Sequence, residues 1–148
     1  MPMNQLAGAD PHAARHAGPA VKQWHGVVAR SAIALVWFYE GWWCKVWPGR
    51  ADQRAIVGDV PFLPHWALTA ALVAIGLAEM AIGLWVLTGR RARGAAVVQT
   101  VLVAGFNAGG LVFSPGQVQE PGRMLTQNLA FVVLIWMASW SSAEAVDR

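Results

Sequence analysis

The residues best suited to chemistry lie in one aromatic stretch, residues 37–48, with the sequence WFYEGWWCKVWP. Glu40 supplies a carboxylate and Lys45 an ammonium group there, near the end of an apolar run that begins near Val27. An ionisable side chain at the centre of a bilayer costs about 2.5–3.5 kcal/mol on insertion scales, so it usually faces a protein interior and often marks function. This stretch therefore predicts a polar site inside a membrane bundle, suited to binding a ligand or exchanging protons.

Four more polar side chains lie within or at the edge of later apolar runs: Glu79, Asn107, Gln127 and Asn128. At ~1.5 Å per residue, Glu40 lies about 10 Å inward from Trp47. Asn107 lies about 9 Å inward from Phe113 on the same scale. Gln127 and Asn128 enter from the same side, and Glu79 is deeper. We therefore expect four helices to direct polar groups into one interior.

Glu40 and Lys45 are not expected to neutralise each other. They are five residues apart and diverge by ~140° in an α-helix, at ~100° per residue. Glu40 should then be protonated or find a partner on another helix, with Lys45 near the rim. Gly76 and Gly83 share a helix face with Glu79, which predicts close helix packing around that carboxylate. Gly105 and Gly109 form a Gly-x-x-x-Gly pair, which predicts a second packing seam.

Four apolar runs must position these residues, at about 27–47, 66–88, 95–113 and 124–140. Each approaches the length needed to cross a ~30 Å hydrocarbon core. Charged residues make up only 13 % of the chain, against ~25 % in soluble domains. The sequence predicts an all-α integral membrane bundle of four transmembrane helices. The bundle should span residues 26–142, after a disordered tail over 1–25 with no cleaved signal peptide and before a short polar tail over 143–148. A short interfacial helix is expected at 52–60.

Basic residues set the expected orientation. Seven lie on the N-terminal side, in the second connection or at the C-terminus: Arg15, Lys22, Arg30, Arg90, Arg91, Arg93 and Arg148. Four lie in or beside the first and third connections: Lys45, Arg50, Arg54 and Arg123. Basic residues favour the cytoplasmic side, so both termini should be cytoplasmic and both longer connections should lie outside.

Several classes of function are disfavoured. Cys44 is the only cysteine, so one chain has neither an intrachain disulfide nor a Cys-x-x-Cys redox pair. A b-type haem needs axial ligands within the membrane, and His25 and His65 should lie at opposite faces. We expect no haem and no metal. The sequence has no nucleic-acid-binding motif, and its positive charge suits topology and anionic headgroups better than nucleic acid.

Short motifs along the four runs resemble the DoxX-like family over about residues 27–140. They are Glu40-Gly41 followed by Cys44-Lys45, Arg50-x-Asp52-Gln53-Arg54, Gly76-Leu-Ala-Glu79, Asn107-Ala-Gly-Gly110 and Gln127-Asn128-Leu129. The family consists of small four-helix membrane proteins, and its name derives from a subunit associated with a terminal quinol oxidase. The resemblance implies a bacterial inner-membrane protein that accompanies a membrane oxidoreductase, more as an accessory subunit than as an enzyme.

The leading hypothesis is an accessory subunit that binds a quinone-like or lipid-like molecule in an outward-facing polar pocket. Glu40 and Glu79 would act as proton or hydrogen-bond groups and Lys45 as a rim cation, while Asn107 and Asn128 orient the ligand. Two alternatives stay open: a small proton-coupled transporter working as an oligomer, and a scaffold in which buried polar groups only lock helices together. The partners of the protein would be the lipid bilayer, a membrane oxidoreductase or further copies of the same chain.

Overall fold

The computed structural model describes the backbone of residues 18–146 and the side chains of residues 24–141. All regular secondary structure in this part is helical. The elements are α1 (Gly18–Phe38), the π-helix η2 (Tyr39–Val46), α2 (Ala51–Gly58), the 3₁₀-helix η3 (His65–Ala67), α3 (Leu68–Thr88), α4 (Ala92–Phe113) and α5 (Pro121–Val146). The all-α prediction is confirmed.

Three helical segments of the described part are long and apolar enough to cross a membrane: His65–Thr88, Ala92–Phe113 and Pro121–Ser141. They correspond to the last three of the four predicted runs. The α1–η2 helix falls outside this group and carries Arg30, Glu40 and Lys45.

Helix α1 begins at Gly18, earlier than the predicted start near Val27. Pro19 is compatible with this start, because the first turn of a helix has no intrahelical partner for a backbone N–H. The predicted disordered tail thus includes residues 18–25, which are helical, and residues 1–17, which lie outside the described residues. The predicted polar tail at 143–148 likewise overlaps α5, which runs to Val146.

The π-helix η2 continues α1 without a break, since Phe38 at their junction keeps right-handed helical angles of φ −67° and ψ −40°. A π-helix is closed by hydrogen bonds between residues five apart instead of four. The Trp47 N–H accordingly donates to the Trp42 carbonyl oxygen at 2.8 Å. Trp47 then turns to an extended conformation, and Pro48 after it cannot continue the helix.

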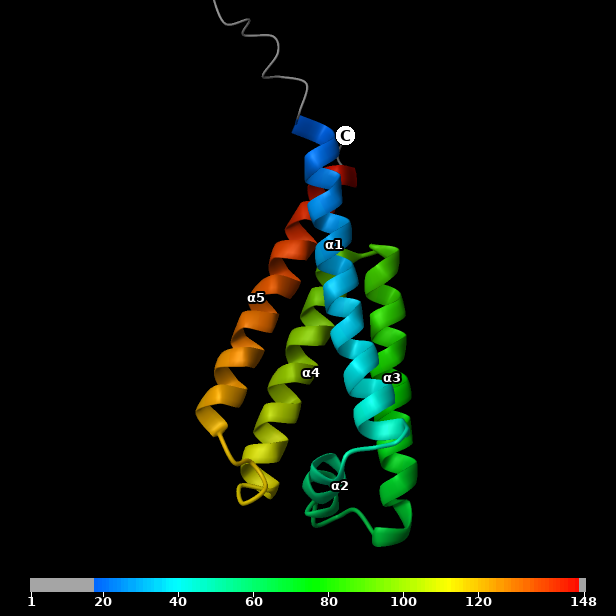
Figure 1. Ribbon diagram of the computed structural model, residues 1–148, viewed down its shortest axis with the longest axis vertical. Helices are drawn as coiled ribbons and strands as arrows, with labels where there is room; N and C mark the ends of the chain where they lie inside the picture. Colours follow the sequence, from blue (N-terminus) through cyan, green and yellow to red (C-terminus); the bar gives the residue numbers. More distant parts are fainter. Residues whose placement is uncertain (1–17, 147–148) are drawn as a thin grey trace, which may run out of the picture.

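The long helices run side by side and spread apart toward one end (Figure 1). The α1–η2 helix packs against α3 and also contacts α5, which in turn packs against α4. The start of α1 and the end of α5 lie at the narrow end, and the short helix α2 lies at the spread end. Helix α2 confirms the predicted short helix, although its position at a membrane interface stays a prediction.

The main apolar core forms where α1, α3, α4 and α5 supply buried side chains. Its buried members are Ile33, Trp37, Ile82, Val86, Ala96, Val103, Ile135 and Ala138. Most of the remaining large apolar side chains on the long helices are exposed, as expected for faces turned toward lipid. This core fixes α4 and α5 against α1, and leaves their other ends free to diverge from η2.

Helix α2 is tied to the ends of the neighbouring helices. The buried Ser114 hydroxyl, just after α4, donates to the Ile56 carbonyl oxygen at 2.8 Å. Arg54 donates to the Thr69 hydroxyl of α3 at 3.2 Å. The connection after α2 also packs on α4, because the Phe62 and Phe113 rings meet edge to face with centroids 5.9 Å apart. These contacts hold α2 across the space between α3 and α4.

Candidate functional site: a polar cavity

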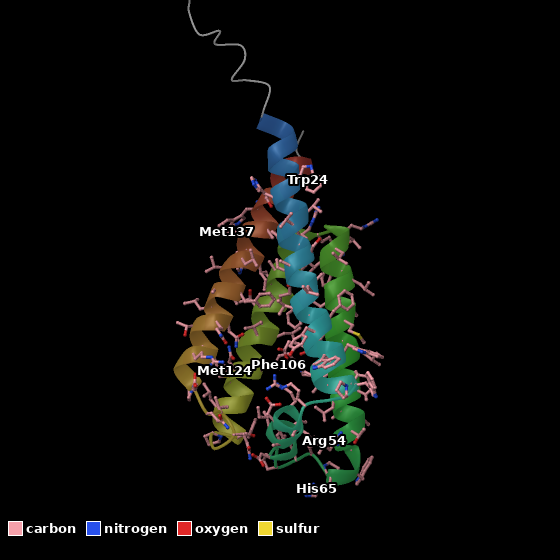
Figure 2. The ribbon with its side chains drawn as sticks, viewed as in Figure 1. Trp24, Arg54, His65, Phe106, Met124 and Met137 are labelled. Carbon is pink, nitrogen blue, oxygen red and sulfur yellow. The ribbon has the colours of Figure 1, made fainter. Side chains whose placement is uncertain are left out.

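A cavity of about 960 Å³ opens at the spread end of the bundle. Its walls come from α1–η2, α2, α3, α4 and α5, and from the connection before α5. Much of the wall is apolar, with Val36, Ile75, Val103, Phe106 and Phe131 among the lining residues. Figure 2 shows Phe106 between α4 and the α1–η2 helix, with Arg54 of α2 nearer the spread end. The volume of the cavity lies in the upper part of the range for small-molecule sites, about 300–1,000 Å³.

All six residues that the sequence singled out line this one cavity: Glu40, Lys45, Glu79, Asn107, Gln127 and Asn128. The predicted convergence of polar groups from four helices is therefore confirmed as geometry. Whether these residues bind a ligand stays a prediction. The side chains form two groups, one on the η2–α3 wall and one on the α4–α5 wall.

On the η2–α3 wall, Lys45 lies between two carboxylates. Its Nζ is 2.9 Å from Glu79 Oε1 and 3.6 Å from Glu40 Oε2. The Lys45 side chain is 7 % exposed and that of Glu79 3 %, whereas that of Glu40 is 40 % exposed. The prediction that Lys45 lies at the rim is wrong, because its ammonium is buried against α3. Glu40 is the member of this triad that presents most surface to the cavity.

The π-helix explains why the predicted separation of Glu40 and Lys45 is also wrong. In an α-helix their directions would differ by ~140°, but η2 joins residues five apart through its hydrogen bonds and so brings them onto one face. Lys45 also donates to the backbone oxygen of Glu40 at 3.4 Å. The Glu-x₄-Lys spacing was the available signal, since it suits a π turn and no α turn.

Glycines make the close approach of η2 and α3 possible. A Cβ added to Gly41 would lie 2.5 Å from the Gly76 carbonyl oxygen, and one added to Gly76 would lie 2.5 Å from the Gly41 carbonyl oxygen. Farther along, a Cβ on Gly83 would lie 3.3 Å from the Ala34 carbonyl oxygen. The predicted close packing around Glu79 is confirmed. It allows a lysine of one helix to reach a carboxylate that the other helix buries.

One oxygen of Glu79 is left over. Oε1 accepts from Lys45, but Oε2 is buried and accepts no hydrogen bond from any described residue. A buried polar atom without a partner is uncommon and costs free energy. Because Glu79 lines the cavity, this oxygen is a candidate contact for a bound molecule.

The α4–α5 wall carries an amide pair. Asn128 Nδ2 donates to Asn107 Oδ1 at 2.6 Å, which joins α5 to α4. Phe106 on the same wall approaches the triad, with its ring centroid 5.8 Å from Lys45 Nζ, within the range of a cation–π contact. Gly105 and Gly109 also line the cavity, and a Cβ on either would meet nothing within 4 Å in the described part of the chain. The predicted packing seam at these two glycines is therefore wrong.

Sequence reasoning missed the hydrogen bond between Trp37 and Gln99. Trp37, which also lines the cavity, donates from Nε1 to Gln99 Oε1 at 2.8 Å, and both side chains are buried. Gln99 in turn donates to the Ala95 carbonyl oxygen at 3.0 Å. A lone glutamine in an apolar run was the only signal. The bond fixes one indole ring of the cavity wall.

Two ion pairs border the cavity near its mouth. Arg50 donates to both oxygens of Asp52 at 3.0 and 2.8 Å, and Arg123 lies 3.0 Å from Glu120. Burial alone would raise the pKa of Asp52, but hydrogen bonds from Arg50 and from the backbone outweigh it and leave that pKa below its usual range. The carboxylate raises the pKa of Arg50 in return. Among the described residues, no group of three His, Cys, Asp or Glu side chains could hold a metal ion.

The family model described as the DoxX-like family matches residues 34–136. The chain belongs to the DoxX-like family. The matched region runs from α1 into α5 and includes all six residues of the two polar groups. No curated protein and no solved structure shows a significant match to the chain. With three helical segments able to cross a bilayer, this DoxX-like protein is a multi-pass membrane protein.

Proposed function

We propose that this DoxX-like protein crosses a bacterial inner membrane four times, with α1–η2 as the first span. The α1–η2 helix packs against α3, which is apolar enough to cross a membrane. Its Glu40 and Lys45 lie 3.6 Å apart, and charged side chains within membrane spans usually pair in this way. Arg30 can extend its charged end toward the headgroups. The connection between α3 and α4, which contains Arg90 and Arg91, lies toward the same end of the bundle as the start of α1, which favours cytoplasmic termini. A reporter at Ser142 should then be cytoplasmic, and labelling from outside would overturn this topology.

The cavity would then open toward the outer face and bind a quinone-like or lipid-like small molecule. The observation that carries this proposal is the combination of one cavity of about 960 Å³, walls that are largely apolar, and polar groups from four helices. Ligand sites are typically apolar clefts with a few polar groups that fix orientation. The rings of Phe106 and Phe131 would contact the apolar body of the ligand.

The polar residues of the cavity would have different roles in binding. Glu40, with its half-exposed side chain, would contact the polar head of the ligand. Asn107, Gln127 and Asn128 would orient it from the opposite wall, while Lys45 and Glu79 hold the inner wall together. The family relationship supports a role as an accessory subunit of a membrane oxidoreductase, to which the bound molecule would belong.

Co-purification tests this proposal most simply. The protein is isolated in a mild detergent, its organic extract is analysed by mass spectrometry, and co-purified proteins are identified. The matched control is Gly109→Trp, which directs an indole into open space on the cavity wall. We expect one quinone or lipid to be enriched with the wild type and lost from the variant, together with a membrane oxidoreductase. An identical extract from both proteins would contradict ligand binding.

A proton-coupled transporter is the second candidate, favoured by the sharing of Lys45 between an exposed and a buried carboxylate. Such sharing gives a ligand and a proton a common place to compete. A transporter in liposomes should move protons when a substrate gradient is applied, and Glu40→Gln should abolish this movement. An accessory subunit should move none.

A further inference from the structure

The ionisable side chains around the cavity do not balance. Four acidic residues line it, Glu40, Asp52, Glu79 and Glu120, against three basic ones, Lys45, Arg50 and Arg123. Asp52 and Glu120 are each paired with an arginine near the mouth. The two remaining carboxylates, deeper in the cavity, share one ammonium group. The inner part of the cavity therefore has one acidic group more than it has cations.

Lys45 has little left to give to a ligand. Its ammonium has three donors, and it contacts Glu79 Oε1 at 2.9 Å, the Glu40 backbone oxygen at 3.4 Å and Glu40 Oε2 at 3.6 Å. An anionic head would have to displace one of these carboxylate contacts and would remain close to both acidic groups. Like charges at such distances repel strongly in a partly desolvated site.

The carboxylates of Glu40 and Glu79, in contrast to Lys45, keep some capacity to accept hydrogen bonds. Glu79 Oε2 is buried on the cavity wall and accepts no hydrogen bond from the described residues, and the Glu40 side chain is 40 % exposed. Aromatic rings complete the environment, since Trp37, Phe106 and Phe131 line the same space. Ring faces attract cations, and this attraction grows when the cation is desolvated.

From this excess of acceptors we infer that the ligand is a lipophilic cation, an apolar body with a protonated amine or another permanently positive head. Its head lies beside Glu40 and Glu79, and its body lies between Phe106 and Phe131. The inference rests on the proposed function, because it keeps the cavity as the binding site of a lipid-like molecule, but it gives that molecule a positive head in place of the neutral head of a quinone. It also predicts that quinones and zwitterionic lipids occupy the cavity less tightly than a cation of similar size.

Two probes of nearly the same shape and opposite charge test this inference. The full-length protein in zwitterionic lipid nanodiscs is titrated with tetraphenylphosphonium or with tetraphenylborate, and binding to empty nanodiscs is subtracted. We expect saturable binding of the cation, at least about tenfold tighter than that of the anion. Equal or tighter binding of tetraphenylborate would overturn the inference.

Two substitutions in the triad are expected to change the affinity for tetraphenylphosphonium in opposite directions. Glu40→Gln removes the exposed carboxylate and should weaken tetraphenylphosphonium binding by about tenfold. Lys45→Met removes the competing ammonium and should strengthen it. Damage to the fold would weaken binding in both variants, so opposite signs cannot arise from misfolding. If Lys45→Met does not fold, Glu40→Gln still decides, because unchanged affinity in that variant contradicts the inference.

The inference and the proposed function fail in different ways. If a neutral quinone or lipid co-purifies with the wild type and is lost in Gly109→Trp, while tetraphenylphosphonium does not bind, only the assignment of charge is wrong. If no molecule co-purifies and neither probe binds, the cavity is not a binding site, and both are wrong.

Discussion

The two walls of the cavity are built in opposite ways. On one wall, η2 and α3 meet so closely that a Cβ on Gly41 would lie 2.5 Å from a carbonyl oxygen of the other helix. On the other wall, Gly109 of α4 faces open space, with nothing within 4 Å of its Cβ position. The same residue type therefore allows helix contact on one wall and leaves volume on the other.

Polar groups follow the same division. The closed wall buries an ion pair between Lys45 and Glu79, with side chains 7 % and 3 % exposed. The open wall carries the amide pair of Asn107 and Asn128, which is only partly buried. We conclude that the η2–α3 wall is closely packed and that the α4–α5 wall borders the open part of the cavity.

The largest effect is expected from side chains added to the glycines of the two walls. Gly41→Val should destabilise the protein by about 3 kcal/mol or more, because the new side chain meets backbone atoms of α3 that cannot move aside. Gly109→Val should change stability by less than about 1 kcal/mol, since its side chain enters open space. Thermal unfolding in detergent measures both. Equal losses would mean that the walls do not differ in packing.

The next largest effect should distinguish the roles of the two carboxylates, Glu79 and Glu40. Glu79→Leu should cost about 2 kcal/mol, less than the usual 3–5 kcal/mol for breaking a buried ion pair, because Lys45 keeps Glu40 as a partner. Glu40→Gln should leave the melting temperature nearly unchanged and reduce ligand binding instead. If Glu40→Gln also leaves ligand binding unchanged, the triad serves packing alone, as a scaffold without ligand would require.

The hydrogen bond between Asn107 and Asn128 should contribute less to the free energy of unfolding. A double-mutant cycle with Asn107→Ala and Asn128→Ala should give a coupling energy of about 0.6 kcal/mol, the average for hydrogen bonds between membrane helices. The partner cycle is Trp37→Phe with Gln99→Leu, in which the hydrogen bond is fully buried. We expect the second coupling to be the larger. The reverse order would show that the open wall is held more firmly than the structure indicates.

The smallest effect is expected at the mouth. Asp52 and Arg50 are about half exposed, so Asp52→Asn should lower stability by about 0.5 kcal/mol or less. Because the pKa of Asp52 is lowered in the folded state, its contribution is present above the usual pKa and is lost as the pH falls through the lowered value. Wild type and variant should therefore melt alike at strongly acidic pH and differ slightly at neutral pH.

Much of the architecture could be predicted from the sequence, for identifiable reasons. Apolar runs give the positions of α3, α4 and α5, and Gly76 and Gly83 beside Glu79 indicate a tight contact. Polar residues at similar depths also indicate that Asn107, Asn128 and Glu40 face one interior. These inferences use helical periodicity and burial, which depend on local sequence.

The details of the site could not be predicted in the same way. The placement of Lys45 depends on a π-helix, which a calculation at ~100° per residue excludes from the start. The open space at Gly105 and Gly109 depends on how far α4 diverges from η2, which is set by the core at the narrow end and by α2. A Gly-x-x-x-Gly pair fits a packed seam and an open wall equally well.

A structure from crystals grown in a lipid mesophase would show both walls of the cavity in a membrane-like environment. We predict that η2 and α3 remain in contact at Gly41 and Gly76, while α4 and α5 stay apart from η2. Density for a small molecule or lipid chain should lie between Phe106 and Phe131, with its polar end at Glu40. A bundle in which α4 and α5 close onto η2, with side chains filling the space, would contradict the division into a closed and an open wall.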